Sequence, residues 1–427
     1  MRRRAETIRV GQERGMSGLG VGSVLAPMVA GLVATKASLM EWVHECGLEA
    51  LGEVFRREAE ELAGEKGRHR RERTHHHWGE TRSELGFGGR RLSVERPRVR
   101  KRGGGEARLP SLDAFRREDP LSERVMRQIL LGVSTRGYGR SLEEAPAGVA
   151  SRGASKSAAS RRLVQATRHK LRVDLERRLE EVELVGLIID GIAVAEHTLV
   201  VALGLSPDGR KLPLGLWHGS TENAALATTL LQNLLARGLR VEGRLLCIID
   251  GSKALRKALR DVLGDLAVVQ RCQVHKKRNV LDHLSQRHRS YVRRALSEAY
   301  SAASAERARR QLMALASWLE RQGEEGAAAS LREGLEETLT VLKLGLPSTL
   351  RRSLSTTNAI ENLLGHFRRV SRNVKQWRGD MRRRWGWLAI ADAQSRFRRL
   401  KGHRDLPLLI RALRESFTHV DQATEAA

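Results

Sequence analysis

Two short apolar runs that end in the same dipeptide decide the fold of this chain. Leu184–Ile189 (LVGLII) is followed by Asp190-Gly191, and Arg244–Ile249 (RLLCII) is followed by Asp250-Gly251. Short, continuous apolar runs bounded by turn residues are typical of strands that are buried on both faces. We therefore predict two buried strands, each ending at an aspartate.

Further elements are predicted around these two strands. Short turns such as Ser206–Gly209 join the first three strands, which should therefore be antiparallel, whereas helical patterns separate the later ones. This order of elements predicts an α/β layer architecture with a mixed sheet. The added strands are Ile192–Leu205, Leu212–Trp217 and Ala267–Gln270, and the helices cover 222–236 and 252–263. Residues 276–345 are helical and charged without a strand pattern, which indicates a helical insertion.

The two aspartates, Asp190 and Asp250, are candidate metal ligands. If their strands are neighbours, the carboxylates meet at one edge of the sheet, and their repulsion favours a cation between them. Mg²⁺ takes oxygen ligands and keeps several waters, so two or three carboxylates suffice, and Mn²⁺ is a possible substitute. The candidate for the third carboxylate is Glu361. It lies in the first turns of a helix that Thr357 or Asn358 can cap. The alternatives remain open that Asp-Gly is an ordinary turn and that Glu361 only favours the helix dipole.

A strongly basic run follows Glu361. Such a run can hold phosphates while indoles stack on bases, although Trp385 and Trp387 are equally compatible with a buried core. The cations are Arg368, Arg369, Arg372, Lys375, Arg378, Arg382, Arg383 and Arg384, and Trp377 lies among them.

The preceding part of the chain shows an amphipathic helix over 38–64 and then a basic zone over 66–102. We interpret this zone as a solvated connector that contains a short strand at Leu92–Val94 and a solvated loop at His75–Trp78. Gly103–Gly105 then forms a flexible joint.

Residues 121–173 predict two or three short helices, with Ser155 as the N-cap of a helix running to about Leu171. Its first two turns carry Lys156, Ser160, Arg161 and Arg162. Small polar and basic side chains at this end are what a recognition helix needs, so a helix-turn-helix is predicted, with a plain surface helix as the alternative.

Composition restricts the partners of the chain. The formal charge of +27 over 427 residues makes nucleic acid the leading partner and an anionic membrane the second. The uncharged stretch Met16–Thr35 holds too many glycines to predict a membrane span or a signal peptide. Three scattered cysteines imply no disulfide framework and fit a reducing compartment, which predicts a cytoplasmic protein associated with the nucleoid.

Four separated blocks of the sequence resemble mutator-type transposases of bacterial insertion sequences, and they follow one another in the same order as in that family. The resemblance covers about residues 120–415. The blocks begin at Ser155 (SKSAASR), Arg271 (RCQVHKKRN), Ser355 (STTNAIENL) and Arg372 (RNVKQWR), the last followed by MRRRW from Met381. The resemblance implies a ribonuclease-H-like fold with a helical insertion. Its three acidic positions match Asp190, Asp250 and Glu361, and its Cys/Asp-x-x-His motif matches Cys272 and His275. We expect His275 to bond a carboxylate or phosphate beside the active site, with structural zinc as the weaker alternative.

The expected protein is therefore a DNA transposase that binds terminal inverted repeats and target DNA as a homodimer or larger assembly. The alternatives are a catalytically inactive relative that regulates by binding DNA and another ribonuclease-H-like nuclease, such as a junction resolvase. The expected domains are a leader (1–36), an N-terminal helix with a basic segment (37–105), an all-α helix-turn-helix domain (106–178), a catalytic domain (180–281 and 346–402), a helical insertion (282–345) and a C-terminal tail (403–427).

Overall fold

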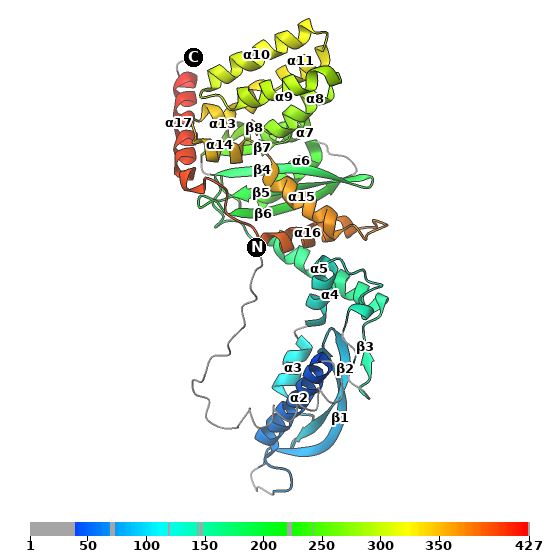
Figure 1. Cartoon of the computed structure of the whole chain (residues 1–427). Coiled ribbons are helices and arrows are strands. Elements are labelled where there is room, and N and C mark those ends of the chain that lie inside the picture. Colours follow the sequence, from blue (N-terminus) through cyan, green and yellow to red (C-terminus); the bar gives the residue numbers. More distant parts are fainter. Residues whose placement is uncertain are drawn as a thin grey trace, which may run out of the picture. The chain divides into compact units, whose positions relative to one another are not determined.

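The computed structural model describes residues 39–68, 73–117, 120–142, 145, 148–219, 224–241 and 243–425 (Figure 1). The chain forms two compact units, one of Met1–Leu121 with Gly137–Lys156 and the other of Ser122–Arg136 with Ser157–Ala427. The segment 106–178, expected as one domain, contributes to both units. The expected leader, residues 1–36, lies outside the described residues.

A five-stranded mixed sheet forms the centre of the second unit. Its strands are β4 (Gly186–Val194), β5 (His197–Leu205), β6 (Lys211–Gly219), β7 (Leu245–Ile249) and β8 (Ala267–Arg271), in the order β6-β5-β4-β7-β8. Strands β4, β5 and β6 are antiparallel, and β7 and β8 continue the sheet parallel to β4. The predicted mixed sheet is thus confirmed.

Strand β4 is longer than predicted. It continues through Asp190 and Gly191, which pair with Val201 and Val200 of β5, and it ends at Val194. The turn comes at Ala195, whose φ of 54° is in the left-handed region. The prediction that a strand ends at Asp190 was therefore wrong, because the ladder with β5 outweighs the local turn preference of Asp-Gly. Only the pairing of β4 with β7 ends beside Asp190, at Ile189.

Helices cover both faces of this sheet. On one face, α6 (Ala224–Ala236) and α7 (Lys253–Leu263) share a core with alternate strand residues such as Ile189, Val200 and Ile249. On the other face, α15 (Asn358–Val370) contacts β4, and α16 (Met381–Gln394) contacts β5 and β6. Because side chains alternate along a strand, Asp190 faces the side of α15.

The helical pattern predicted over 276–345 is confirmed, and the helices of this region have their own core. This core joins nineteen buried residues between Val280 and Leu342. The helices are α8 (Gln273–Asp282), α9 (Gln286–Tyr300), α10 (Ala305–Arg321), α11 (Glu325–Arg332), α12 (Leu335–Thr338) and α13 (Thr340–Lys343), followed by α14 (Ser348–Leu354).

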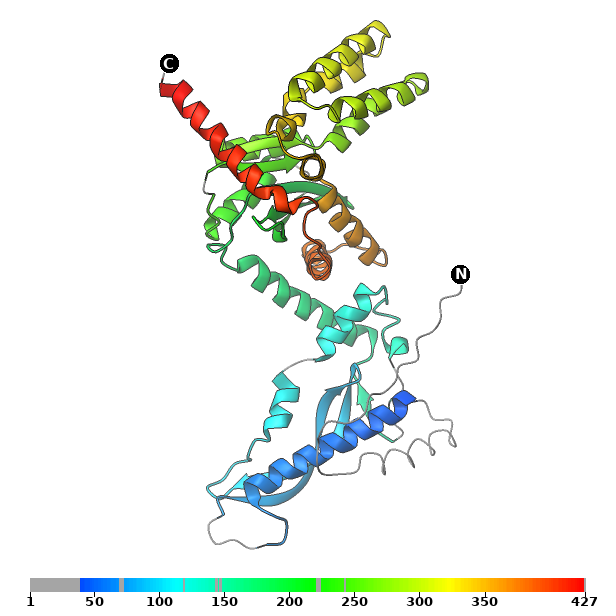
Figure 2. The ribbon, with the colours of Figure 1, turned by 60° about the vertical axis from the view of Figure 1, so that its left-hand side comes forward.

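The first unit is built on a helix and a long hairpin, which Figure 2 shows side by side. Helix α2 (Leu39–Ala63) confirms the predicted amphipathic helix, and it packs on β1 (His75–Phe87) and β2 (Arg90–Lys101). Their core includes Phe55, Leu85, Val99 and Leu109, the last preceding α3 (Pro110–Arg117).

The hairpin corrects the interpretation of residues 66–102 as a connector. His75–Trp78 lies in β1 and is not a loop, and the glycines 103–105 form a tight turn in which Lys101 N donates to Gly105 O at 3.0 Å. Only a few of the side chains that face the core are fully buried in either strand. The alternation of apolar and polar residues that marks a strand is therefore hidden among charged residues. The pairing of the two strands, which is not a local property, stabilises them.

Helix α5 (Lys156–Glu176) begins directly after Ser155, as predicted, and extends beyond Leu171. Helix α4 (Pro120–Leu130) precedes it, but residues 131–155 connect the two, and this connection includes the short 3-10 helix η1 (Gly139–Ser141) and β3 (Ser151–Arg152). Strand β3 pairs with β2, so the expected domain 106–178 is not all α. The helix-turn-helix stays a prediction.

The expected C-terminal tail is mostly helical. Helix α17 (Leu406–Glu425) follows the short 3-10 helix η3 (His403–Asp405) and buries Leu406, Leu409 and Leu413, which recur at helical spacing. Among the described residues, no helix is long and apolar enough to cross a membrane.

Gly402, which directly precedes η3, lies very close to the backbone of Leu350 in α14. Its φ is +79°, and a Cβ there would lie 2.8 Å from Leu350 N and 2.9 Å from Leu350 Cα. We expect Gly402→Ala to lower the free energy of unfolding by about 2–3 kcal/mol, measured by thermal or denaturant unfolding, from strain together with a backbone clash. Gly345→Ala is the matched control, because its φ is +65° and no atom lies within 4 Å of the added Cβ. If both variants lose the same free energy of unfolding, the close approach to Leu350 adds nothing to the cost of Gly402→Ala.

Candidate active site

The register of the two central parallel strands brings Asp190 and Asp250 together. Ile189 of β4 pairs with Ile249 of β7, so the next residue on each strand is an aspartate. Asp190 is only 4% exposed, whereas Asp250 is half-buried where β7 ends. The two residues that the sequence singled out are therefore neighbours in the sheet.

Local hydrogen bonds hold both carboxylates. Asp190 Oδ1 accepts from Gly191 N at 2.8 Å, and Asp250 Oδ1 accepts from Ser252 N at 2.9 Å. Ser252 also caps α7, since its Oγ accepts from Leu255 N at 3.3 Å. Gly251 has a φ of 109°, which a side chain rarely adopts, and it lets the chain turn between Asp250 and the helix. These bonds leave the other oxygen of each carboxylate available to a ligand.

Two backbone hydrogen bonds bring α15 to the same edge of the sheet. Cys272 N donates to Ile249 O at 2.7 Å, and Gln273 N donates to Ser355 O at 2.9 Å. The start of α8 is thereby tied both to the end of β7 and to the segment before α15. Glu361, in the first turn of α15, comes close enough to Asp190 for its charge to act on the pKa of that carboxyl, although a long helical segment separates the two in the sequence.

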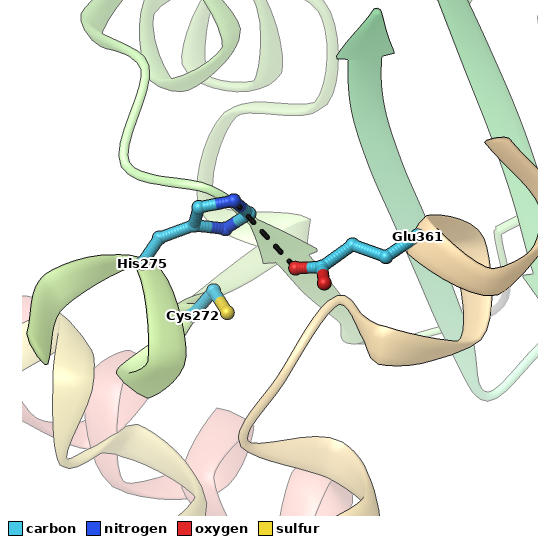
Figure 3. Close-up of side chains that lie close together, drawn as sticks. All are labelled: Cys272, His275 and Glu361. Carbon is cyan, nitrogen blue, oxygen red and sulfur yellow. Dashed lines mark ion pairs between the residues drawn. The ribbon is translucent and has the colours of Figure 1, made fainter. Parts of the chain in front are cut away.

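Glu361 is held by neighbours from two elements, and Figure 3 shows it facing His275 beside Cys272. Thr357 Oγ1 donates to Glu361 Oε1 at 3.1 Å, and His275 Nε2 lies 3.5 Å from the same oxygen. Thr357 N donates to Cys272 Sγ at 3.4 Å, and Thr357 Oγ1 lies 3.3 Å from His275 Nδ1. The expectation that His275 lies against a carboxylate is confirmed.

The electrostatics of this cluster fit a bound cation. Burial, together with the negative charges of Asp250 and Glu361, raises the pKa of Asp190 to about 7, although the charge of His275 acts in the opposite direction. Such a shift shows that the carboxylates repel one another in a poorly solvated place. A divalent ion among them would remove the repulsion, and carboxylate oxygens are the donors that Mg²⁺ takes.

Cys272 and His275 form a polar pair beside these carboxylates. The hydrogen bond with Cys272 raises the pKa of His275 to about 9 in spite of partial burial, and the charges of Cys272, Asp190 and Glu361 add to the effect. Burial alone would raise the pKa of Cys272, but hydrogen bonds with His275 and Thr357 lower it below its ordinary value. The pair therefore presents a positive imidazolium to Glu361 at neutral pH.

Thr357 was one of two residues, with Asn358, expected to cap this helix. It does precede the first residue of α15, but its side chain makes no capping bond and instead bonds Glu361. The spacing of the two residues, four apart, places both on one side of the first helical turn and is the signal that could have shown the contact.

The basic run after Glu361 divides into exposed and buried residues. All five predicted cations of its first part are exposed: Arg368, Arg369, Arg372, Lys375 and Arg378. Trp377 is half-buried, and its ring centroid lies 6.0 Å from that of Phe367. These residues stay available to a polyanion.

The second part of the run has structural contacts. Arg382 and Arg384 are buried, and Arg384 Nε donates to Asp380 at 2.8 Å, so including these two in a phosphate-binding face was wrong. Trp385 and Trp387 belong to the core, and Trp387 donates to Asp174 at 2.7 Å. Both indoles face α5, since Trp387 bonds Asp174 of that helix and Trp385 lines a pocket with Leu163 and Val164.

The predicted recognition residues lie along the first two turns of α5. Lys156 and Arg161 are exposed, whereas Ser160 and Arg162 are half-buried. Ser160 and Arg161 line a hollow of about 650 Å³ whose other lining residues are Val164, Gln165, Arg168, His169 and Arg172. Ser160 also lines a second pocket together with Lys375, so two blocks far apart in sequence meet there.

The chain matches the family described as transposase, Mutator family, over residues 36–381, which is most of its length. It therefore belongs to the Mutator family of transposases, and the resemblance stated from the sequence is confirmed.

Several individual transposases are similar to this chain. The transposase of element ISRM3 from Rhizobium meliloti is 33% identical over 187 residues, which are 44% of this chain and 46% of that protein. The transposase of IS905 from Lactococcus lactis is 28% identical over 304 residues, covering 68% of this chain and 71% of that protein. The transposase of IS256 in transposon Tn4001 from Staphylococcus aureus is 27% identical over 269 residues. The match to the Rhizobium protein spans about half of that relative's length.

Proposed function

We propose that this protein is a DNA transposase that binds the terminal inverted repeats of an insertion sequence. It would catalyse metal-dependent strand cleavage and strand transfer through Asp190, Asp250 and Glu361. The observation that carries this proposal is the register of β4 with β7, which makes Asp190 and Asp250 neighbours, and Glu361 of α15 supports it because its charge acts on Asp190.

A ribonuclease-H-like core belongs to the same proposal. Three antiparallel strands followed by two parallel ones support it, as do acidic residues on the two central neighbours, β4 and β7. The helical segment between Asp250 and Glu361 agrees with the insertion that the family resemblance implies.

The cofactor that fits the donor set is Mg²⁺, with Mn²⁺ as a possible substitute, and Asp190, Asp250 and Glu361 are the residues that would hold it. When bound, it would supply activation of a water or a DNA 3′-hydroxyl and stabilisation of the leaving oxygen. The protein itself orients the carboxylates: Ser252 holds Asp250, and Thr357 and His275 hold Glu361.

The basic surfaces would bind the DNA. Arg368, Arg369, Arg372, Lys375 and Arg378 are exposed cations suited to phosphates, and Trp377 offers a partly exposed ring. Lys156, Ser160, Arg161 and Arg162 would read the terminal repeats from the start of α5. Since two DNA ends must be joined, the active form would be a homodimer or a larger assembly, working in the cytoplasm at the nucleoid.

The test is strand nicking by the purified full chain on DNA that carries the inverted repeats flanking its gene. We expect cleavage at the repeat ends with Mg²⁺ or Mn²⁺ and none with a chelator. Preference for four-way junctions over linear ends would instead indicate a junction resolvase. Binding to the ends without any metal-dependent nicking would indicate an inactive relative that regulates by binding DNA.

Thr357 is a positioning residue for Glu361, and Thr357→Val tests this role. The change keeps the shape and removes the hydroxyl, so we expect nicking to fall by about 10- to 100-fold and the Mg²⁺ titration midpoint to rise. Thr357→Ser should restore both values, because it returns the hydroxyl.

Thr356→Val is the matched control, since Thr356 Oγ1 accepts a bond from Asn358 N and makes none to Glu361. A Thr357→Val variant with an unchanged Mg²⁺ midpoint would refute the positioning role.

A further inference from the structure

A cluster of three chemically different side chains lies beside the aspartate pair. One ligand atom each from Cys272, His275 and Glu361 lies within 4.8 Å of the other two (Figure 3). Cys272 is fully buried, whereas the side chains of His275 and Glu361 are 19% and 32% exposed. The cluster is therefore closed on its sulfur side and open to solvent on its carboxylate side.

These donors suit another metal than Mg²⁺. A thiolate and an imidazole favour borderline-soft ions such as Zn²⁺, whereas Mg²⁺ prefers oxygen ligands alone. Tetrahedral zinc has ligand atoms roughly 3.3–3.8 Å apart, so the observed spacing requires side-chain shifts of about 1 Å at most. Three protein ligands leave the fourth position to water, on the open side.

Neighbouring groups support a metal at this place. Thr357 N donates to Cys272 Sγ at 3.4 Å, and Thr357 Oγ1 donates to Glu361 Oε1 at 3.1 Å. Hydrogen bonds from the surrounding chain to the ligand atoms are what orient the ligands of metal sites in proteins. Cys272 is itself fixed between β7 and α8, because its N–H donates to Ile249 O.

We propose that Cys272, His275 and Glu361 form a site for a zinc-like ion that withdraws Glu361 from the carboxylate set. Binding of the ion would replace the contact between His275 and Glu361 with bonds to one metal. Because Glu361 cannot complete both sites at once, the zinc-bound protein would lack its third catalytic carboxylate. The inhibitory part of this inference rests on the proposed function, whereas the metal site itself does not.

Cobalt titration of the metal-free full chain tests the site without any activity measurement. Co²⁺ replaces Zn²⁺ in such sites, and a bound thiolate gives a charge-transfer absorption band. We expect this band at one equivalent per chain, its loss in Cys272→Ser, and affinity at least about 10-fold weaker in His275→Gln. Cys46→Ser, on α2 of the other unit, should keep the band. Absence of the band, or a band that survives Cys272→Ser, would overturn the proposal.

Asp250→Asn separates this proposal from the proposed function. Asp250 is no member of the cluster, so its variant should keep the cobalt band while losing nicking. A band in a wild-type protein that nicks no DNA would support the metal site and refute the proposed function.

Inhibition by Zn²⁺ tests the link to Glu361. At fixed Mg²⁺, the Zn²⁺ concentration that halves each protein's own nicking rate should rise at least about 10-fold in Cys272→Ser, and in the wild type it should rise with added Mg²⁺. An unchanged value in Cys272→Ser would refute the shared use of Glu361.

Discussion

Replacing any one of the three acidic residues by its amide should lower strand nicking by at least about 1,000-fold, which is about 4 kcal/mol of barrier. The variants are Asp190→Asn, Asp250→Asn and Glu361→Gln. Each removes one negative charge without changing the volume, so the effect follows from lost metal coordination. Quantified nicking of DNA carrying the terminal repeats, over a range of Mg²⁺ concentrations, measures it.

The same three variants should remain folded and should bind DNA at least as tightly as the wild type, because each removes a charge that repels phosphate. For Asp190→Asn we also expect equal or higher thermal stability of the metal-free protein. A carboxylate that is 4% exposed and next to Asp250 destabilises the fold when no cation is bound. Thermal unfolding and filter binding check these points.

Asp265→Asn is the matched control, because Asp265 is exposed and precedes β8, at the opposite end of the parallel strands from Asp250. Near-normal nicking by one of the three variants would remove that residue from the site. Loss of nicking in Asp265→Asn as well would show that charge alone, and not coordination, explains the effect.

The sequence predicted the sheet because its strands carry a local signal. The runs before Asp190 and Asp250 are apolar on both faces, which only a covered sheet explains, and the structure places them side by side. The end of β4 was misplaced because it depends on pairing with β5, a contact that no local pattern reveals. The hairpin of β1 and β2 was missed for the same reason, since few of its side chains are fully buried.

The site was predictable only in part. The parallel strands made the pairing of Asp190 with Asp250 predictable. Glu361 was only a candidate for the third carboxylate, chosen for its place at a helix start and then supported by the family resemblance, because a long helical segment separates it from Asp250 in the sequence. The contacts that hold Glu361 come from α8 and from the residue before α15, and two backbone hydrogen bonds bring these segments together. Such tertiary contacts leave no periodic pattern in the sequence.

Replacing Lys156, Arg161 and Arg162 together by alanine should remove the preference for terminal repeats over random DNA. Each base contact is worth about 1–3 kcal/mol, so affinity for the repeats should fall by roughly 100-fold or more. Binding to random DNA should persist with a steep salt dependence, since Arg368, Arg372 and the other exposed cations after Glu361 are untouched. Competition binding at several salt concentrations measures both quantities.

A variant with the same loss of charge distinguishes recognition from general attraction. Arg307, Arg310 and Arg321 are exposed on α10 of the helical insertion, and their joint replacement by alanine also removes three positive charges. This control should weaken binding to repeats and to random DNA by similar factors, because long-range attraction depends on charge and carries no sequence information. The α5 variant should instead lose affinity for the repeats selectively, because the start of that helix would contact base edges. If the preference survives in the α5 variant, the recognition helix lies elsewhere in the chain.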